Sequence, residues 1–143
     1  MRRDNTLQSG LYYRSFWIIA IAMEVVIVVL QVIVALGLLN VWLVRAKKPT
    51  PFRGGEAKTI RDEFDAYGLP SFMMYLVGGL KVIVAITMVA GIWLHDLVWP
   101  AAAVLILLMI GAFAMHLKVK DPWIKSVPSL LMLAMAIAIA VLR

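Results

Sequence analysis

Four long apolar stretches occupy most of this chain and restrict it to one class of fold. They cover residues 16–44, 72–94, 98–117 and 124–142. The last three are about as long as the roughly 20 residues that an α-helix needs to cross the hydrocarbon of a bilayer. The first is longer, so it should tilt or project beyond the hydrocarbon. A lipid-facing strand would leave backbone amides unpaired, and none of the stretches alternates apolar and polar residues as the strands of a membrane barrel do. We therefore expect an all-α membrane protein whose four transmembrane helices form an antiparallel bundle.

Composition supports a single membrane-embedded domain over residues 1–143. Hydrophobic residues make up 64% of the chain and charged residues 15%, whereas soluble domains are about half apolar and a quarter charged. The chain has no cysteine, which excludes disulfides and thiolate chemistry. The net charge of +6 comes mainly from Lys and Arg residues flanking the apolar stretches, so we expect no nucleic-acid partner. The first stretch is about twice as long as the core of a secretory signal, which predicts a retained helix.

The distribution of Lys and Arg residues predicts the orientation of the bundle. The loops at 45–71 and 118–125 hold nine of them, against four in the N-terminal segment, the turn near His95 and the C-terminus. The four are Arg2, Arg3, Arg14 and Arg143. By the positive-inside rule, these two loops are cytoplasmic and both termini lie outside.

The loop from 45 to 71 is the one sizeable polar segment, and part of it has a helical pattern. Between Gly55 and Tyr67, apolar residues recur at steps of three and four. They are Ala57, Ile60, Phe64 and Tyr67. This pattern predicts a short amphipathic helix that ends at Gly68, with Pro70 turning the chain back into the membrane. The helix is either a solvated surface element or a lid that docks a partner or covers a site.

Glu24, Gln31 and Asn40 interrupt the first apolar stretch, and Lys81 is the one charge in the second. We take three of these residues as a candidate polar centre: Glu24, Gln31 and Lys81. At about 1.5 Å per residue, Glu24 lies roughly 12 Å below one face and Lys81 roughly 14 Å below the other. In a core about 30 Å thick these depths nearly coincide, so the two charges are expected to pair. Gln31 follows on nearly the same helical face as Glu24. The centre is either an ion pair that sets helix register or a proton- or ligand-linked pocket.

His116 closes the third apolar stretch and is followed by Asp121 and Pro122, which begin the last helix. A lone histidine at a helix end is interpreted as a hydrogen-bonding residue at the membrane interface. With no second histidine at ligand spacing, we expect no metal site. No nucleophile elbow, phosphate loop or dinucleotide fingerprint occurs, so we assign no catalytic residue and no required cofactor.

Two segments of the chain resemble the DoxX-like family of small membrane proteins. They are FDAYGLPSFMMYLVGGLKVIVAI and GAFAMHLKVKDP, and the resemblance extends over about residues 53–143. The matching motif positions are Tyr67, Gly68, Pro70, Gly78, Gly79, His116, Asp121 and Pro122. The resemblance implies a four-helix bundle with a polar centre. Family members often carry Glu where this chain has Lys81, so an acidic functional group is not carried over to that position.

The resemblance leaves three functions from different classes open. The family includes assembly factors such as the receptor-assembly chaperone NACHO, whose equivalent loops face the lumen, and subunits of quinone-linked oxidoreductases. The first function, favoured by the lack of catalytic constellations, is an accessory, chaperone-like module acting through membrane-protein partners or as a homodimer. The second is a membrane subunit of a quinone-linked oxidoreductase, with quinone or another lipid bound in the bundle. The third is a proton-coupled small-molecule transporter that uses Glu24.

Overall fold

The computed structural model describes the backbone of residues 2–143 and the side chains of residues 13–143, so the side chains of Arg2 and Arg3 lie outside the described range. Helix α1 (Arg2–Leu39) continues into a π-helical turn, Asn40–Val44. Helices α3 (Ser71–Ala90), α4 (Val98–Lys118) and α5 (Trp123–Leu142) follow. All four helices are long and apolar enough to cross a membrane. The predicted all-α fold is confirmed, and the protein is an integral, multi-pass protein of the lipid bilayer.

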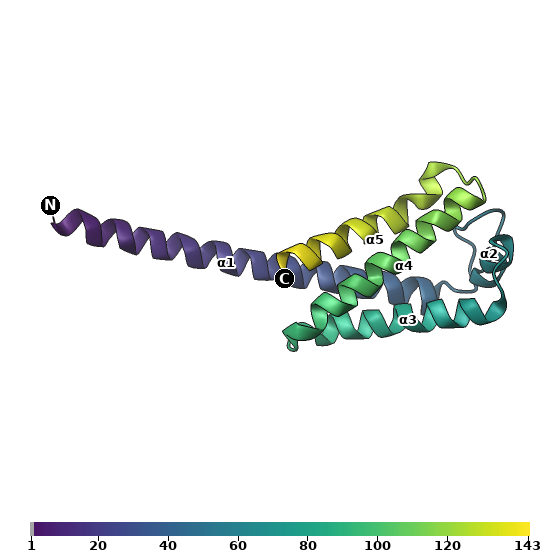
Figure 1. Cartoon of the computed structure of the whole chain (residues 1–143), viewed down its shortest axis with the longest axis horizontal. Helices are drawn as coiled ribbons and strands as arrows, with labels where there is room; N and C mark the ends of the chain where they lie inside the picture. The colour runs from purple at the N-terminus through teal and green to yellow at the C-terminus, as the bar shows by residue number, and fades with distance from the viewer. Residues whose placement is uncertain (1) are drawn as a thin grey trace.

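The four helices form a closed ring in which each touches two neighbours. α1 lies beside α3 and α5, and α4 lies beside the same two helices (Figure 1). Figure 1 also shows that α1 extends well beyond the bundle on its N-terminal side, and that the C-terminus of α5 lies beside the middle of α1. The bundle therefore uses only the second half of α1.

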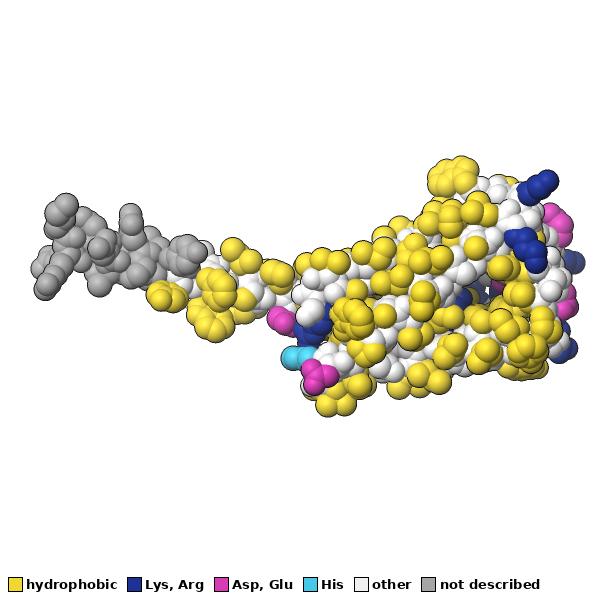
Figure 2. Space-filling model, in the orientation of Figure 1, with side chains coloured by type: hydrophobic (Ala, Val, Ile, Leu, Met, Phe, Trp, Pro, Cys, Tyr) yellow, Lys and Arg dark blue, Asp and Glu magenta, His cyan; other side chains and the backbone are white. Residues whose placement is uncertain are grey.

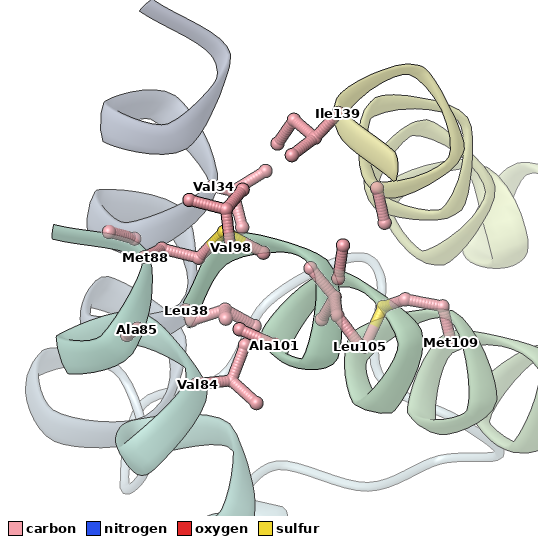
Figure 3. Packing of buried hydrophobic residues seen from close by; sticks show 13 residues of the cluster. Val34, Leu38, Val84, Ala85, Met88, Val98, Ala101, Leu105, Met109 and Ile139 are labelled. Carbon is pink, nitrogen blue, oxygen red and sulfur yellow. The ribbon is translucent and has the colours of Figure 1, made fainter. Parts of the chain in front are cut away.

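The tightly packed core lies in the half of the bundle near the α3–α4 connection, where a 3-10 turn, His95–Leu97, joins the two helices. Figure 3 shows Val34 and Leu38 of α1 facing Val84 and Met88 of α3 in this core. Five alanines are almost completely buried there: Ala35, Ala85, Ala101, Ala102 and Ala136. Such small side chains let helix backbones approach closely. The helices are therefore held together most firmly at this end.

The polar loop contains one short helix, α2 (Ile60–Ala66), which starts later than the predicted Gly55. Thr59 caps it by accepting a hydrogen bond from the Asp62 amide at 3.2 Å, while the Asp62 carboxylate accepts from the Thr59 amide at 2.9 Å. This capping box fixes the start of the helix and leaves Ala57 outside it. At the other end Gly68 adopts φ +71°, a backbone conformation that favours glycine, and ends the helix as predicted.

Candidate functional site

A cavity of about 410 Å³ lies in the half of the bundle away from the tightly packed core. Its walls come from the end of α1, from α3, α4 and α5, and its cover comes from the polar loop, residues 45–70, which we call the roof. The walls are mainly apolar, with side chains such as Met73, Val77 and Leu108. Figure 2 shows the molecule hollowed near this end, with Lys or Arg atoms visible inside the hollow. The volume is within the range of about 300–1,000 Å³ that is usual for small-molecule sites.

Lys81 brings a positive charge into this cavity from the middle of α3. Its ammonium nitrogen lies 5.1 Å from the centre of the Trp42 ring, close enough for a cation–π contact. Among the described residues it forms no hydrogen bond or ion pair. Gly78, one turn earlier on α3, provides the space for the indole, because a Cβ there would lie 2.6 Å from the Trp42 ring. Because Gly78 has no side chain, the Trp42 ring can lie against α3 and beneath the ammonium of Lys81, three residues further along the helix.

A network of buried polar groups holds the roof together, centred on the Glu63 carboxylate. Glu63 accepts hydrogen bonds from Arg53 Nη1 at 3.1 Å, from the Gly54 amide at 2.7 Å and from the Tyr67 hydroxyl at 3.1 Å. Arg53 Nη2 also donates to the carbonyl of Arg45 at 2.7 Å, which ties the end of the first membrane span to the roof. Burial, followed by the neighbouring Glu63 charge, raises the pKa of Tyr67 far above its usual value. Tyr67 therefore stays neutral and donates to Glu63.

A second network fastens the roof to the turn between α4 and α5. Asp121 accepts hydrogen bonds from His116 Nδ1 at 2.8 Å and from the Gly55 amide at 3.0 Å. Lys125 lies 3.5 Å from the same carboxylate and donates to the Gly55 carbonyl at 2.6 Å. Lys118 donates to the Tyr67 carbonyl at 2.7 Å. The contacts of Gly55 and Tyr67 join the roof to residues more than 50 positions later in the sequence, and we call the whole network the latch.

The charge state of Asp121 follows from opposing effects within the latch. Burial alone raises its pKa, but the hydrogen bonds from His116 and from the Gly55 amide, with the Lys125 charge, outweigh burial. The net effect holds the pKa of Asp121 below its ordinary value. The carboxylate is therefore ionised at neutral pH.

Four aromatic rings line the underside of the roof and connect the two networks. The ring centres lie 6.2 Å apart for Trp42 and Phe64, 6.4 Å for Phe64 and Tyr67, and 6.0 Å for Tyr67 and His116. The first and last pairs meet edge to face, a favourable geometry for aromatic rings. The chain of rings runs from Lys81 to the latch and gives the cavity an aromatic ceiling.

The expected pairing of Glu24 with Lys81 is wrong. Glu24 forms an ion pair with Arg143 at 2.6 Å and is 58% exposed. Lys81 instead lies beside Trp42, eighteen residues after Glu24, in the π-helical turn that follows α1. The depth estimate assumed that the first helix enters the membrane at Phe16, but α1 begins at Arg2 and runs past the bundle. Glu24 consequently lies level with the C-terminus and not with the middle of α3.

Gln31 also lies apart from Lys81. It is fully buried between α1 and α3, and its Nε2 donates to the Met88 carbonyl at 3.1 Å. Its side-chain oxygen has no partner among the described groups. The three residues of the candidate polar centre therefore occupy three separate places, and only Lys81 reaches the cavity.

The remaining motif positions divide into residues at the cavity and residues at helix ends. Tyr67 and His116 line the cavity, Asp121 forms the latch and Gly78 seats Trp42. Pro70 and Pro122 precede α3 and α5 as their N-terminal caps. Gly79 is exposed on the outer face of α3, where a Cβ would meet no atom within 4 Å.

Sequence reasoning missed three residues that shape the site. Trp42 has the pattern of an interfacial anchor, and nothing in its spacing links it to Lys81. Glu63 could have been found, because it lies four residues before Tyr67 on one helix, a spacing at which side chains meet. Arg53 has no sequence signal, since its partners are mostly backbone carbonyls of the preceding turn.

The polar side chains of the cavity wall suit an organic ligand with a polar head better than they suit a metal ion. Within the described residues, no three His, Cys, Asp or Glu side chains are close enough to hold a metal. The cavity instead combines apolar walls with a few convergent donors, the usual make-up of a small-molecule site. An apolar molecule could insert between the helices and present a polar group to Lys81.

Comparison with known proteins identifies a family but no individual relative. Neither the curated proteins nor the solved structures contain a match to this chain. The model of the DoxX-like family matches residues 52–139, which is more than half of the chain and includes most of the roof, α3, α4 and nearly all of α5. The chain therefore belongs to the DoxX-like family.

Proposed function

We propose that this protein is an accessory module of the membrane that binds a lipid-soluble small molecule in the cavity beneath the roof. The observation that carries the proposal is the unpaired Lys81 ammonium in a mainly apolar cavity of about 410 Å³. A charge near mid-membrane is costly, and such residues usually mark a functional site. If the bundle were simply packed at this point, an apolar residue at position 81 would give it a higher free energy of unfolding.

The surroundings of Lys81 support a built site over a packing fault. Gly78 makes room for Trp42, and the roof covers the cavity through two polar networks in which both oxygens of Glu63 and of Asp121 are hydrogen-bonded, although the buried Arg53 Nε has no partner among the described groups. Buried polar networks of this kind rigidify a structure when their groups are satisfied. The roof thus gives the cavity a defined shape before any ligand binds.

A quinone-linked oxidoreductase subunit is the alternative within the same ligand class. A quinone has an apolar ring system and carbonyl oxygens that accept hydrogen bonds from groups such as the Lys81 ammonium. In that case another chain would supply the electrons. Bound quinone recovered in stoichiometric amount would favour this alternative.

The chaperone-like function through a protein partner has one observation in its favour. From Phe16 to Met23, α1 is exposed and apolar on all sides beyond the Glu24–Arg143 pair. A helix that is apolar all round is normally buried. Photo-cross-linking from Ile18 in native membranes, with Ile83 on the outer face of α3 as the control position, tests for a stoichiometric membrane-protein partner.

The transporter function has less support, because the carboxylate on which it depends, Glu24, lies outside the cavity. A transported proton or cation requires a carboxylate that alternates between two occupants, and Glu24 is engaged by Arg143 at one end of the bundle. The cavity wall contributes one carboxylate, Glu63, and its oxygens accept three hydrogen bonds. We therefore prefer ligand binding to transport.

The test of the proposed function fills the cavity and compares ligand capture. Ala112 lines the cavity on α4, whereas Ala114 of the same helix is exposed. Wild-type protein, Ala112→Phe and Ala114→Phe are labelled in membranes with a membrane-soluble diazirine probe, and the labelled peptides are identified by mass spectrometry. We expect labelling of cavity peptides in the wild type and Ala114→Phe but not in Ala112→Phe. Equal labelling of all three, or none in the wild type, refutes the proposal.

A further inference from the structure

We infer that the ligand of the cavity is an anionic amphiphile, whose carboxylate or phosphate group binds Lys81 and whose tail leaves between α3 and α4 into the bilayer. The inference rests on the proposed function and names its ligand class. It depends on the charges of the cavity wall, on the state of each charged group and on the shape of the opening.

The charges along the cavity wall are mostly positive. Among the described residues, the wall includes four Lys or Arg side chains, Arg45, Arg53, Lys81 and Lys125, and one carboxylate, that of Glu63. Glu63 already pairs with Arg53 at 3.1 Å. The unneutralised charge in the cavity is therefore positive.

Of the four Lys and Arg side chains in the described wall, Lys81 lies farthest along a membrane helix from the roof, and it forms no hydrogen bond or ion pair. Lys125 donates to Gly55 and lies beside Asp121, and Arg53 makes four hydrogen bonds. Arg45 is exposed at the membrane surface. An incoming anion would thus find one ammonium without a hydrogen bond or ion pair, positioned over the Trp42 ring at 5.1 Å and attracted only at longer range by Glu63.

An anion fits this ammonium better than a neutral head does. A neutral acceptor forms a hydrogen bond with the amine but leaves the positive charge uncompensated in an apolar environment. A carboxylate or phosphate both accepts the hydrogen bond and neutralises the charge, and charge-assisted bonds are roughly twice as strong as neutral ones. The apolar surroundings strengthen this attraction further.

The cavity opens through its side wall, toward lipid. Leu107 and Gly111 of α4 line the cavity and are also exposed on the outer surface. A Cβ at Gly111 would meet no atom within 4 Å, so the wall is open at this residue. Met73 and Val77 of α3 also line the cavity and are half-buried. Figure 2 shows the corresponding hollow on the lateral face, near the end covered by the roof. An acyl chain that enters here passes from the bilayer into the cavity without crossing water.

The test compares two photoactivatable probes that differ only in charge. One is a diazirine fatty acid, which is anionic, and the other is the corresponding diazirine fatty alcohol, which is neutral. The variants are Lys81→Met, Lys81→Arg and, as the matched control, Lys47→Met in an exposed part of the roof outside the cavity wall. Lys81→Met removes a charge without a partner, so we expect it to fold, and its melting temperature verifies this.

We expect the anionic probe to label the cavity peptides of the wild type, Lys81→Arg and Lys47→Met. Labelling of Lys81→Met should fall roughly 30-fold or more, as for the loss of one partner of a desolvated charge pair. The neutral probe should label weakly and without dependence on Lys81. Gly111→Phe should reduce anionic labelling, whereas Gly79→Phe on the outer face of α3 should not.

The outcomes separate this inference from the proposed function. Equal labelling by both probes, or anionic labelling that survives Lys81→Met, overturns the anionic ligand and leaves the cavity function standing. Labelling of the cavity by neither probe overturns both. Mass spectrometry of lipids that purify with the wild type then distinguishes a free fatty acid from an anionic phospholipid, and a bound quinone in their place also overturns the inference.

Discussion

The latch at Asp121 should control how tightly the roof closes over the cavity. The carboxylate accepts from His116 and Gly55, and Lys125 lies 3.5 Å away. Asp121→Asn keeps the shape of the side chain but removes its charge and turns one acceptor into a donor. We expect this substitution to loosen the roof locally and to leave the four membrane helices in place.

The expected magnitude follows from the contacts that are lost. A hydrogen bond to a charged group contributes about 1.5–3 kcal/mol. The asparagine oxygen retains one of the two hydrogen bonds, with His116 or with Gly55, so the other is lost together with the attraction to Lys125. The roof should therefore open about 2 kcal/mol more easily, which corresponds to a roughly 30-fold larger open population.

Hydrogen exchange measures this change at the residue concerned. In lipid nanodiscs at neutral pH, the Gly55 amide should exchange roughly 30-fold faster in Asp121→Asn, with peptides of α5 unchanged. Asp96→Asn, in the exposed turn at the opposite end of the bundle, is the matched control and should match the wild type. Unchanged exchange at Gly55 in Asp121→Asn would show that the latch does not hold the roof.

Acid should weaken the same latch. Because the pKa of Asp121 is lower in the folded protein than in the unfolded chain, its contribution to stability is present above the unfolded value of about 3.9 and is lost as the pH falls through the folded value. The difference in melting temperature between the wild type and Asp121→Asn should be smaller at pH 3 than at pH 5, because the carboxylate is protonated as the pH falls below about 4. A constant difference down to pH 3 would contradict the assignment. The groups facing this carboxylate are His116, Lys125 and the Gly55 amide.

Two further substitutions test the helix contacts. Gly78→Val should displace Trp42 and lower the free energy of unfolding by about 1–3 kcal/mol through overpacking. Gly79→Val, at the open lipid face, is the control and should have little effect. Equal melting temperatures for the two variants would contradict the packing of Trp42 against Gly78. Glu24→Gln should cost less than about 1 kcal/mol, because Glu24 is 58% exposed and pairs with Arg143 at the end of the bundle. A loss of several kcal/mol in a denaturant titration would argue that a partner buries the pair.

Much of the fold could be predicted because the hydrophobic effect acts on whole segments. A run of twenty apolar residues has few alternatives to a membrane helix, so the four spans can be predicted from the order of apolar and polar residues in the sequence. The start of α2 cannot be predicted in this way. The spacing of Ala57 suits a helix, but the Thr59–Asp62 capping box begins the helix at Ile60, three residues later. Local hydrogen bonds of this kind decide helix ends and override periodicity.

The candidate site was predictable only in part, because depth along a helix depends on where the helix begins relative to the bundle. Lys81, Tyr67, His116 and Asp121 were identified from residue type and motif, and all four belong to the cavity or its latch. The partner of Lys81 was assigned wrongly because α1 continues beyond the bundle, a property that packing with α3 and α5 determines.

The two halves of the bundle have opposite roles, and the placement of small residues explains why. Alanines such as Ala85 and Ala102 let the helices meet closely at the turn end, where the core is fully packed. At the other end Trp42 and Lys81 stand between the helices, and the backbone cannot close around them without burying the ammonium against apolar side chains. A ligand with a complementary charge therefore stabilises the open half without any rearrangement of the packed half. Binding should accordingly raise the melting temperature while leaving hydrogen exchange in the turn-end core unchanged, since only states with an intact cavity gain the ligand's binding energy.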